Sequence, residues 1–186
     1  GKDTAQVADL IAGFANATTG SMGDFKTALS AGGAAAKLAG QDFDQFATAI
    51  ALMGKAGILG SDAGTSLKTM LLNLIPTTER QSEAMRNLGL MTNAVHNNFL
   101  NADGSFKDLR DISAELNRAT KDLTESERAL ALEAIFGSDA IRAAAILSEA
   151  GAEGFDKMAD RTIGRAAVSA RNAGLCMAAA DIPPMP

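Results

Sequence analysis

Glycines that recur at short intervals constrain what this chain can fold into more than any other sequence feature. From Gly54 to Thr78 the sequence reads GKAGILGSDAGTSLKTMLLNLIPTT, with four glycines directly before an apolar segment that stops at Pro76. Glycine adopts positive φ and permits close backbone approach, whereas proline lacks the amide that would continue a helix. The segment therefore predicts a sharp reversal followed by a short helix, and it argues against one continuous rod.

The apolar segment after these glycines has the period of a helix. Leu67, Met70, Leu71 and Leu74 recur at i, i+3, i+4 and i+7, which places them on one stripe that needs a packing partner. We expect Ser61 or Asp62 to cap a helix from residue 65 to 74, which the glycine turn docks against the preceding helix. The residues that we predict to matter structurally, here and at later turns, are Gly57, Gly60, Gly64, Leu67, Leu71, Leu74, Pro76, Gly89, Gly104 and Gly137.

The rest of the chain predicts a mainly all-α module of about seven to eight short helices. Strand-type β-branched runs are nearly absent and aromatic residues are only 4%, all Phe, so Ala, Leu, Ile and Met must fill the core. Asp42, Thr77 or Thr78, Thr124 and Ser138 are the expected caps. The segments with a helical pattern cover residues 4–15, 25–38, 43–53, 65–74, 78–88, 107–119, 124–136, 138–147 and 154–161.

Three local features refine this prediction. Gly32 and Gly33 lie inside an expected helix, which indicates close packing against another helix or a kink. Leu130, Ala134 and Ile135 are the apolar residues expected to pack from the helix that follows Thr124. An Asp103–Gly104 turn predicts a small β-hairpin near residues 95–107, with an irregular loop as the alternative.

We expect residues 1–163 to form one helical module, while a division into two lobes near residues 76–100 stays open. Residues 164–186 are rich in Ala and end in Pro183, Pro184 and Pro186, so we expect a poorly ordered or vector-derived tail. The chain starts at Gly1 without Met. This start predicts either a piece of a longer protein or a processed terminus.

Composition disfavours several classes of function. The net charge of −5 and a pI near 4.9 lack the clustered cations that nucleic acid requires. No uncharged apolar run approaches the roughly 20 residues that cross a bilayer. Cys176 is the single cysteine, which rules out an intramolecular disulfide and a cysteine metal cluster. We therefore expect no nucleic acid, membrane or cofactor partner for this segment.

The candidates for chemistry are equally weak. His96 is the single histidine and has no second base or ligand in its NAVHNN context. A calcium-loop alignment on Gly104 places Phe99 and Arg110 where carboxylates are needed. Gly64 is not followed by the lysine of a phosphate loop. We expect no catalytic residue, no metal and no cofactor.

The acidic residues Glu125, Glu127 and Glu133 invite comparison with the paired carboxylates of glycoside hydrolases. Their position at the start of an expected helix favours a capping role instead.

Three segments in order resemble the core region of bacteriophage or prophage tail tape-measure proteins. They are AGILGSDAGTSLKTMLLNLIPTTERQSEAMRNLGL, NADGSFKDLRDISAEL and LALEAIFGSDAIRAAAIL, and the resemblance spans roughly residues 7–161. It implies a structural tail component that sets tail length and assists assembly, and that is made in the bacterial host cytoplasm and located inside the virion tail. The implied partners are other tape-measure copies, in a homo-oligomer, and tail-tube or tail-assembly proteins.

Two other readings remain open from the residues alone. One is a helical protein-interaction domain, an adaptor or effector unrelated to phage, and the less favoured one is a segment of a cell-wall hydrolase. If the family resemblance holds, the frequent glycine breaks predict that this segment is a folded module and not the length-measuring rod itself.

Overall fold

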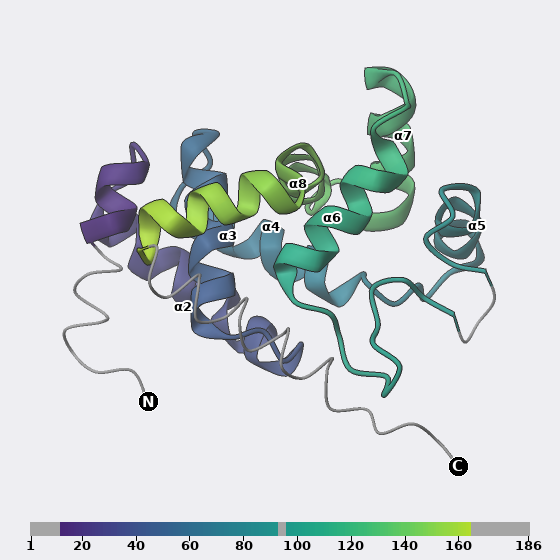
Figure 1. The fold of residues 1–186 in the computed structure, drawn as a ribbon, viewed down its shortest axis with the longest axis horizontal. Helices are drawn as coiled ribbons and strands as arrows, with labels where there is room; N and C mark the ends of the chain where they lie inside the picture. Colours follow the sequence, from purple (N-terminus) through teal and green to yellow (C-terminus); the bar gives the residue numbers. More distant parts are fainter. Residues whose placement is uncertain (1–11, 93–95, 165–186) are drawn as a thin grey trace, which may run out of the picture.

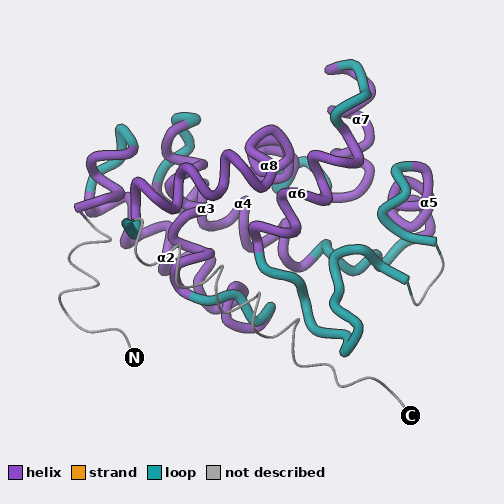
Figure 2. The backbone as a smooth tube through the Cα atoms, viewed as in Figure 1, coloured by secondary structure: helices purple, strands orange, loops and turns teal. Residues whose placement is uncertain are grey.

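The computed structural model describes residues 12–92 and 96–164, and the regular structure in these residues is helical, with no strand (Figures 1 and 2). Residues 12–17 form a short helical stretch, whereas most of the helix expected at 4–15 lies outside the described residues. The all-α prediction is confirmed. The helices are α2 (Met22–Leu38), α3 (Phe43–Lys55), α4 (Gly60–Leu72), α5 (Glu79–Asn87), α6 (Leu109–Thr120), α7 (Glu125–Phe136) and α8 (Ile141–Thr162).

Side-chain caps define the start of several helices. The Asp42 side chain accepts the Gln45 amide at 2.7 Å at the start of α3. Thr78 and Thr124 each form a reciprocal capping box, with Gln81 and Glu127 respectively. These caps agree with the sequence prediction, because a short oxygen side chain satisfies first-turn amides using only local residues.

The predicted cap of α4 is wrong. The helix begins earlier, at Gly60, with Leu59 at the N-cap position and no side-chain cap bond. Ser61 and Asp62 therefore lie inside the first turn. Gly60 has φ of 58°, a left-handed entry that other residues rarely adopt, so the helix can start directly from the glycine turn.

The predicted cap of α8 is also wrong. Ala140 and not Ser138 precedes the helix, and it makes no side-chain cap bond. A backbone turn provides the entry, because the amide of Ile141 donates to the Gly137 carbonyl at 3.0 Å. Gly137 has φ of 77°, which reverses the chain between α7 and α8.

The expected hairpin is reduced to isolated bridges. Met91 pairs with Asn97 and Leu100 pairs with Phe106, but no two-stranded ladder forms in the described residues. Gly104 lies in the intervening turn with φ of 84°. The segment does not form two paired strands, because Phe99 is fully buried in the core and the Asn97 side chain donates a hydrogen bond to the Leu74 carbonyl at 2.8 Å. The irregular-loop alternative therefore describes this segment better.

The α4 helix packs chiefly against α2, with α3 a smaller neighbour. A Cβ atom on Gly64 would lie 2.2 Å from the Ala28 carbonyl oxygen, and one on Gly32 would lie 2.6 Å from both the Gly64 oxygen and the Phe46 ring. The backbones of α2 and α4 therefore approach to a distance that only glycine permits. The contact between α4 and α3 agrees with the prediction that the glycine turn docks these two helices, but the larger partner, α2, was not predicted. Close packing at Gly32 is confirmed.

A kink divides α8 where two separate helices were expected. Gly151 inside it has φ of 58° and ψ of −166°, which interrupts the helical hydrogen-bond ladder. Side chains of α6 bind the carbonyls around this break: Ser113 donates to Leu147 and to Gly151, and Asn117 donates to Ser148 at 2.8 Å. The α6–α8 contact thus satisfies polar groups that the kink releases.

Both halves of the chain contribute to one hydrophobic core. The α8 helix packs against α3 and α4 as well as against α6 and α7. The apolar stripe of α4 lies in this core, with Leu67, Met70 and Leu74 at 0% exposure and Leu71 at 2%. The phenylalanines that fill the space between the helices, each at most 2% exposed, are Phe14, Phe46, Phe99, Phe136 and Phe155.

Leu71→Asp is expected to unfold the chain, because it places a carboxylate in the apolar stripe of α4. An unpaired buried charge costs more than about 4 kcal/mol, a large share of the stability of a small domain. The matched control is Leu72→Asp, since Leu72 is 55% exposed. Far-UV circular dichroism during urea titration measures both. A native midpoint for Leu71→Asp would contradict the packing described here.

Gly64→Val tests the close crossing of α2 and α4. Its side chain has no room beside the Ala28 carbonyl, so we expect a loss of about 2 to 3 kcal/mol in the free energy of unfolding. Gly33→Ala is the control on the neighbouring face of α2, where an added Cβ meets only the Leu29 side chain at 3.5 Å. It should stabilise the protein by about 0.5 to 1 kcal/mol through helix propensity. Equal effects in urea unfolding would contradict the crossing.

Candidate interaction surface

The predicted structural residues lie at turns and in the core, and they do not gather at one surface. Gly57, Gly60, Gly89, Gly104 and Gly137 all have positive φ, between 58° and 84°. The remaining positions are Gly64 at the helix crossing, the buried Leu67, Leu71 and Leu74, and Pro76 just beyond the end of α4. Their importance for the fold stays a prediction, which substitutions test.

The described residues show little that resembles a reactive centre. No group of three or more His, Cys, Asp or Glu side chains with metal-ligand geometry occurs in the described ranges. Within the same ranges, no helix is long and apolar enough to cross a membrane. At the start of α7, hydrogen bonds from the Thr124 hydroxyl and amide hold the pKa of Glu127 below its ordinary value. Glu127 thus serves as a capping carboxylate, in contrast to the protonated acid that glycoside hydrolysis needs.

Two glutamines at the start of α3 hold the start of α6. The amide of Leu109 donates to Gln41 Oε1 at 2.8 Å, and the amide of Arg110 donates to Gln45 Oε1 at 3.1 Å. Both glutamines are buried. First-turn amides have no partner within their own helix, so these side chains cap α6 from a distant part of the chain. Gln41 also donates to the Lys107 carbonyl at 2.9 Å, which fixes the loop before α6.

A bidentate ion pair joins the same end of α6 to α8. Arg110 donates from Nε and Nη2 to the two carboxylate oxygens of Asp156, at 2.8 and 2.9 Å. These hydrogen bonds raise the pKa of Arg110, against the opposing effect of burial. The parallel geometry makes this pair stronger than an ordinary surface ion pair. It fixes α6 against the part of α8 that follows the Gly151 kink.

The carboxylate of Glu115 lies between two cations on the outer side of α6. It is 3.3 Å from Lys107 and 2.8 Å from Arg118. Burial raises the pKa of Glu115, but the hydrogen bonds and charges of Arg118 and Lys107 outweigh this effect, and the pKa lies below its ordinary value. The ionised carboxylate therefore stabilises the folded state above the ordinary pKa of Glu, and this contribution is lost as the pH falls through the lowered value.

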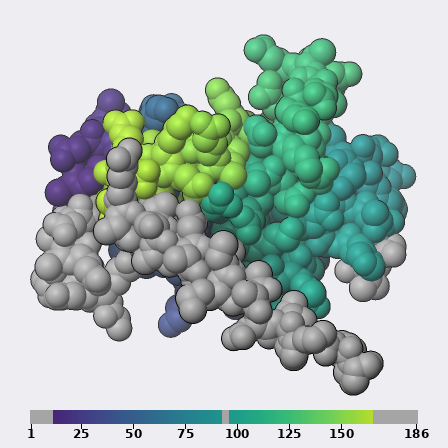
Figure 3. Space-filling view, in the orientation of Figure 1, coloured from purple at the N-terminus to yellow at the C-terminus, as the bar shows by residue number. Residues whose placement is uncertain are grey.

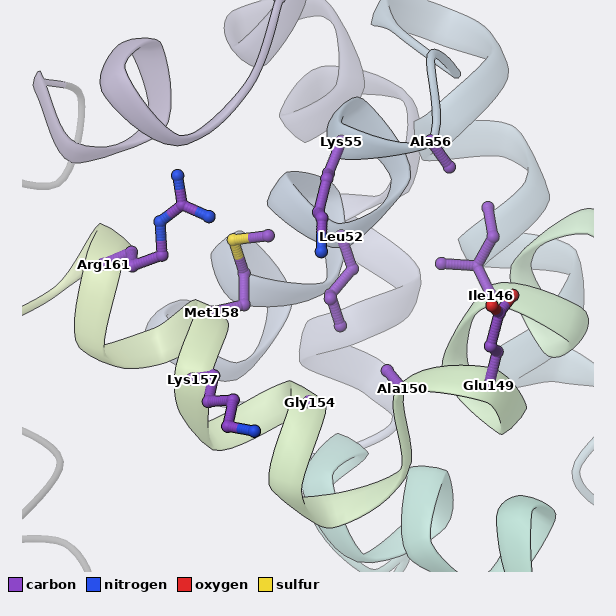
Figure 4. A pocket seen from close by; sticks show the side chains of 10 residues that line it. All are labelled: Leu52, Lys55, Ala56, Ile146, Glu149, Ala150, Gly154, Lys157, Met158 and Arg161. Carbon is purple, nitrogen blue, oxygen red and sulfur yellow. The ribbon is translucent and has the colours of Figure 1, made fainter. Parts of the chain in front are cut away.

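A pocket of about 380 Å³ opens between the end of α3 and the parts of α8 on both sides of the Gly151 kink (Figure 4). Figure 4 shows the Met158 thioether facing Leu52, with Lys55 and Arg161 beside them. We call this the α3–α8 pocket. Its full lining is Leu52, Lys55, Ala56, Ile146, Glu149, Ala150, Gly154, Lys157, Met158 and Arg161.

The exposed side of α7 carries an apolar residue, Leu130, that was expected from the sequence to be packed. Ile135 is buried as expected, together with Leu132 and Phe136, but Leu130 is 63% exposed. The prediction fails at Leu130 because apolar residues occur on several sides of this Ala- and Leu-rich helix. Figure 3 shows the corner of α6 and α7 standing out from the described surface beside α8.

The residues of the α3–α8 pocket and the two glutamines that cap α6 were not identified from the sequence. The α3–α8 pocket combines positions about 100 residues apart, from Leu52 to Arg161, so no local motif announces it. Gln41 and Gln45 follow an ordinary helix-start pattern, and their role as caps of α6 depends on tertiary structure. One usable signal was the i, i+4 spacing of Lys157 and Arg161 on one side of the final helix.

A double-mutant cycle on Arg110→Ala and Asp156→Ala measures the link between α6 and α8. We expect a coupling free energy of about 1 kcal/mol, because the bidentate pair is partly buried. The control cycle uses Lys157 and Glu153, whose side chains are 72% and 82% exposed, and should give about 0.5 kcal/mol or less. Urea unfolding of the variants supplies both values. A coupling at Arg110–Asp156 no larger than the control would contradict the proposed link.

Comparison of the sequence with known proteins shows the family of this chain. The model of the phage-related minor tail protein family matches residues 1–137. The tape measure protein of Pneumococcus phage Dp-1 is 31% identical over 157 residues, which cover 84% of this chain and 13% of that protein. A probable tape measure protein of Escherichia phage P2 is 29% identical over 155 residues, covering 83% of this chain and 18% of that protein. No solved structure matches significantly.

These matches confirm the resemblance that the three sequence segments indicated. The chain spans less than a fifth of the length of either relative. The family match covers α2 to α7 and the turn at Gly137, which is most of the described fold. The chain belongs to the phage-related minor tail protein family and is similar to tape-measure proteins, structural components of phage tails.

Proposed function

We propose that this chain is a folded module of a tape-measure protein, which sets tail length and assists tail assembly. Similarity to two tape-measure proteins over more than four fifths of the chain supports this function. The module is located inside the virion tail and is made in the cytoplasm of the bacterial host. Its role is structural and non-catalytic, in keeping with the family and with the capping and packing roles of its polar residues.

The observation that carries this proposal is the compact helical packing. As a continuous α-helix, 186 residues would extend about 280 Å. A folded domain of this length has a radius of gyration of about 16 Å, which corresponds to a diameter of about 40 Å. The module therefore contributes little to the length of the parent protein. It acts through contacts, while regular helical parts of the parent measure distance.

The proposed partners are other copies of the tape-measure protein, in a homo-oligomer, and tail-tube or tail-assembly proteins. We also propose that residues 1–163 act as one unit and not as two lobes. The α3–α6 caps and the packing of α8 against α3 and α4 support a single unit, because they join the chain before and after residues 76–100. Residues 164–186, expected as a poorly ordered or vector-derived tail, lie outside the described residues.

No observation supports the two alternative functions, an adaptor or effector domain and a segment of a cell-wall hydrolase. Membership of a phage tail protein family leaves no observation in favour of an adaptor or effector unrelated to phage. The cell-wall hydrolase reading depended on the carboxylates near the start of α7, where Glu127 is committed to the helix cap.

An in-frame deletion of this module from the parent gene tests the proposal. Electron microscopy of the particles measures tail length. We expect tails within about 40 Å of the normal length, because a folded module adds only its own diameter. A deletion of equal length in a regular helical part is the control, and it should shorten the tail by about 280 Å. Shortening by about 280 Å after deletion of the module would contradict the proposal.

A further inference from the structure

The α3–α8 pocket offers an apolar floor with a cationic rim. Leu52 and Met158 are largely buried at its base, and Lys55, Lys157 and Arg161 surround them. The acidic residues of the rim are Glu149, in the lining, and Asp160, beside the same three cations. Lys157 is paired with Glu153. Within the described residues, Lys55 and Arg161 form no ion pair. The pocket therefore suits an apolar side chain that is accompanied by negative charge.

The exposed face of α7 presents that combination. Leu130 is 63% exposed, and Glu127 and Glu133 lie three residues before and after it, which places them on the same side of the helix. Arg128 lies about 200° around the helix axis from Leu130 and does not neutralise this face. We call Glu127, Leu130 and Glu133 the α7 face. Leu130 thus offers one apolar side chain flanked by two carboxylates, which complements an apolar pocket that has unpaired cations at its rim.

We infer that the α7 face of one copy docks into the α3–α8 pocket of a second copy. Leu130 enters the pocket over Leu52 and Met158, while Glu127 and Glu133 meet Lys55 and Arg161. This interface rests on the proposed self-association and gives it a location. Two different surfaces of the molecule meet, so the contact is heterologous and continues from copy to copy as a ring or a helical row.

The expected contact is weak and dependent on salt. One leucine contributes about 1.5 to 3 kcal/mol on full burial. Each exposed ion pair adds about 1 kcal/mol or less. The isolated chain should therefore associate weakly and reversibly through this contact. In the parent protein, where other parts of the molecule hold the copies together, their effective concentration is higher. In about 1 M salt, where the screening length is about 3 Å, association should weaken.

Charge reversal on each surface separately gives a specific test. The pocket variant combines Lys55→Glu and Arg161→Glu. The face variant combines Glu133→Lys and Ser126→Lys, and it keeps the Thr124–Glu127 capping box intact. Sedimentation velocity of the concentrated 186-residue chain measures association, and circular dichroism checks that each variant is folded. Arg80→Glu, at an exposed position of α5 that belongs to neither surface, is the control.

We expect the wild-type chain and the control to associate, and each variant alone to remain monomeric because like charges meet. An equimolar mixture of the two variants should associate again, since acidic faces then meet basic pockets and basic faces meet acidic pockets. A wild-type chain that stays monomeric would overturn the inference and leave the pocket to a different tail protein. Variants that associate like the wild type would also overturn it, while the proposed self-association would stand. A mixture that stays monomeric would overturn it as well.

Discussion

The close approach of α2 and α4 is the constraint on which the other contacts depend. Gly32 has no side chain, and the space this leaves is occupied by the Gly64 backbone of α4 and by the Phe46 ring of α3. Three helices are thereby fixed by one small residue. Since α3 in turn caps α6 through Gln41 and Gln45, and packs against α8, the later half of the chain is positioned by the earlier half.

Features that depend on a few neighbouring residues could be predicted from the sequence. The caps at Asp42, Thr78 and Thr124 and the buried stripe from Leu67 to Leu74 follow from local chemistry and helical period. Tertiary choices could not be predicted in the same way. The partner of α4 depends on which helix offers a glycine groove, and the exposure of Leu130 depends on which side of α7 meets α5 and α8. For the same reason the sequence indicated the α3–α8 pocket only weakly, through the spacing of Lys157 and Arg161.

Glycine breaks make this segment a compact module instead of a rod. Breaks at Gly57, Gly89, Gly137 and Gly151 turn the chain back on itself, so residue number is not converted into distance here. The segment instead exposes a protruding acidic face and a basic-rimmed pocket. Contacts of this kind suit the role that we propose, in which this module organises copies of the parent protein.

The central claim is that this chain is a packed module and not a rod. Small-angle X-ray scattering of the dilute chain in about 1 M salt, where self-association is weakened, measures its radius of gyration directly. We expect about 16 to 20 Å, close to the value for a folded domain of this length. A value near 80 Å, as for a continuous helix about 280 Å long, would contradict it. A value near 46 Å, as for an unfolded chain, would contradict it equally.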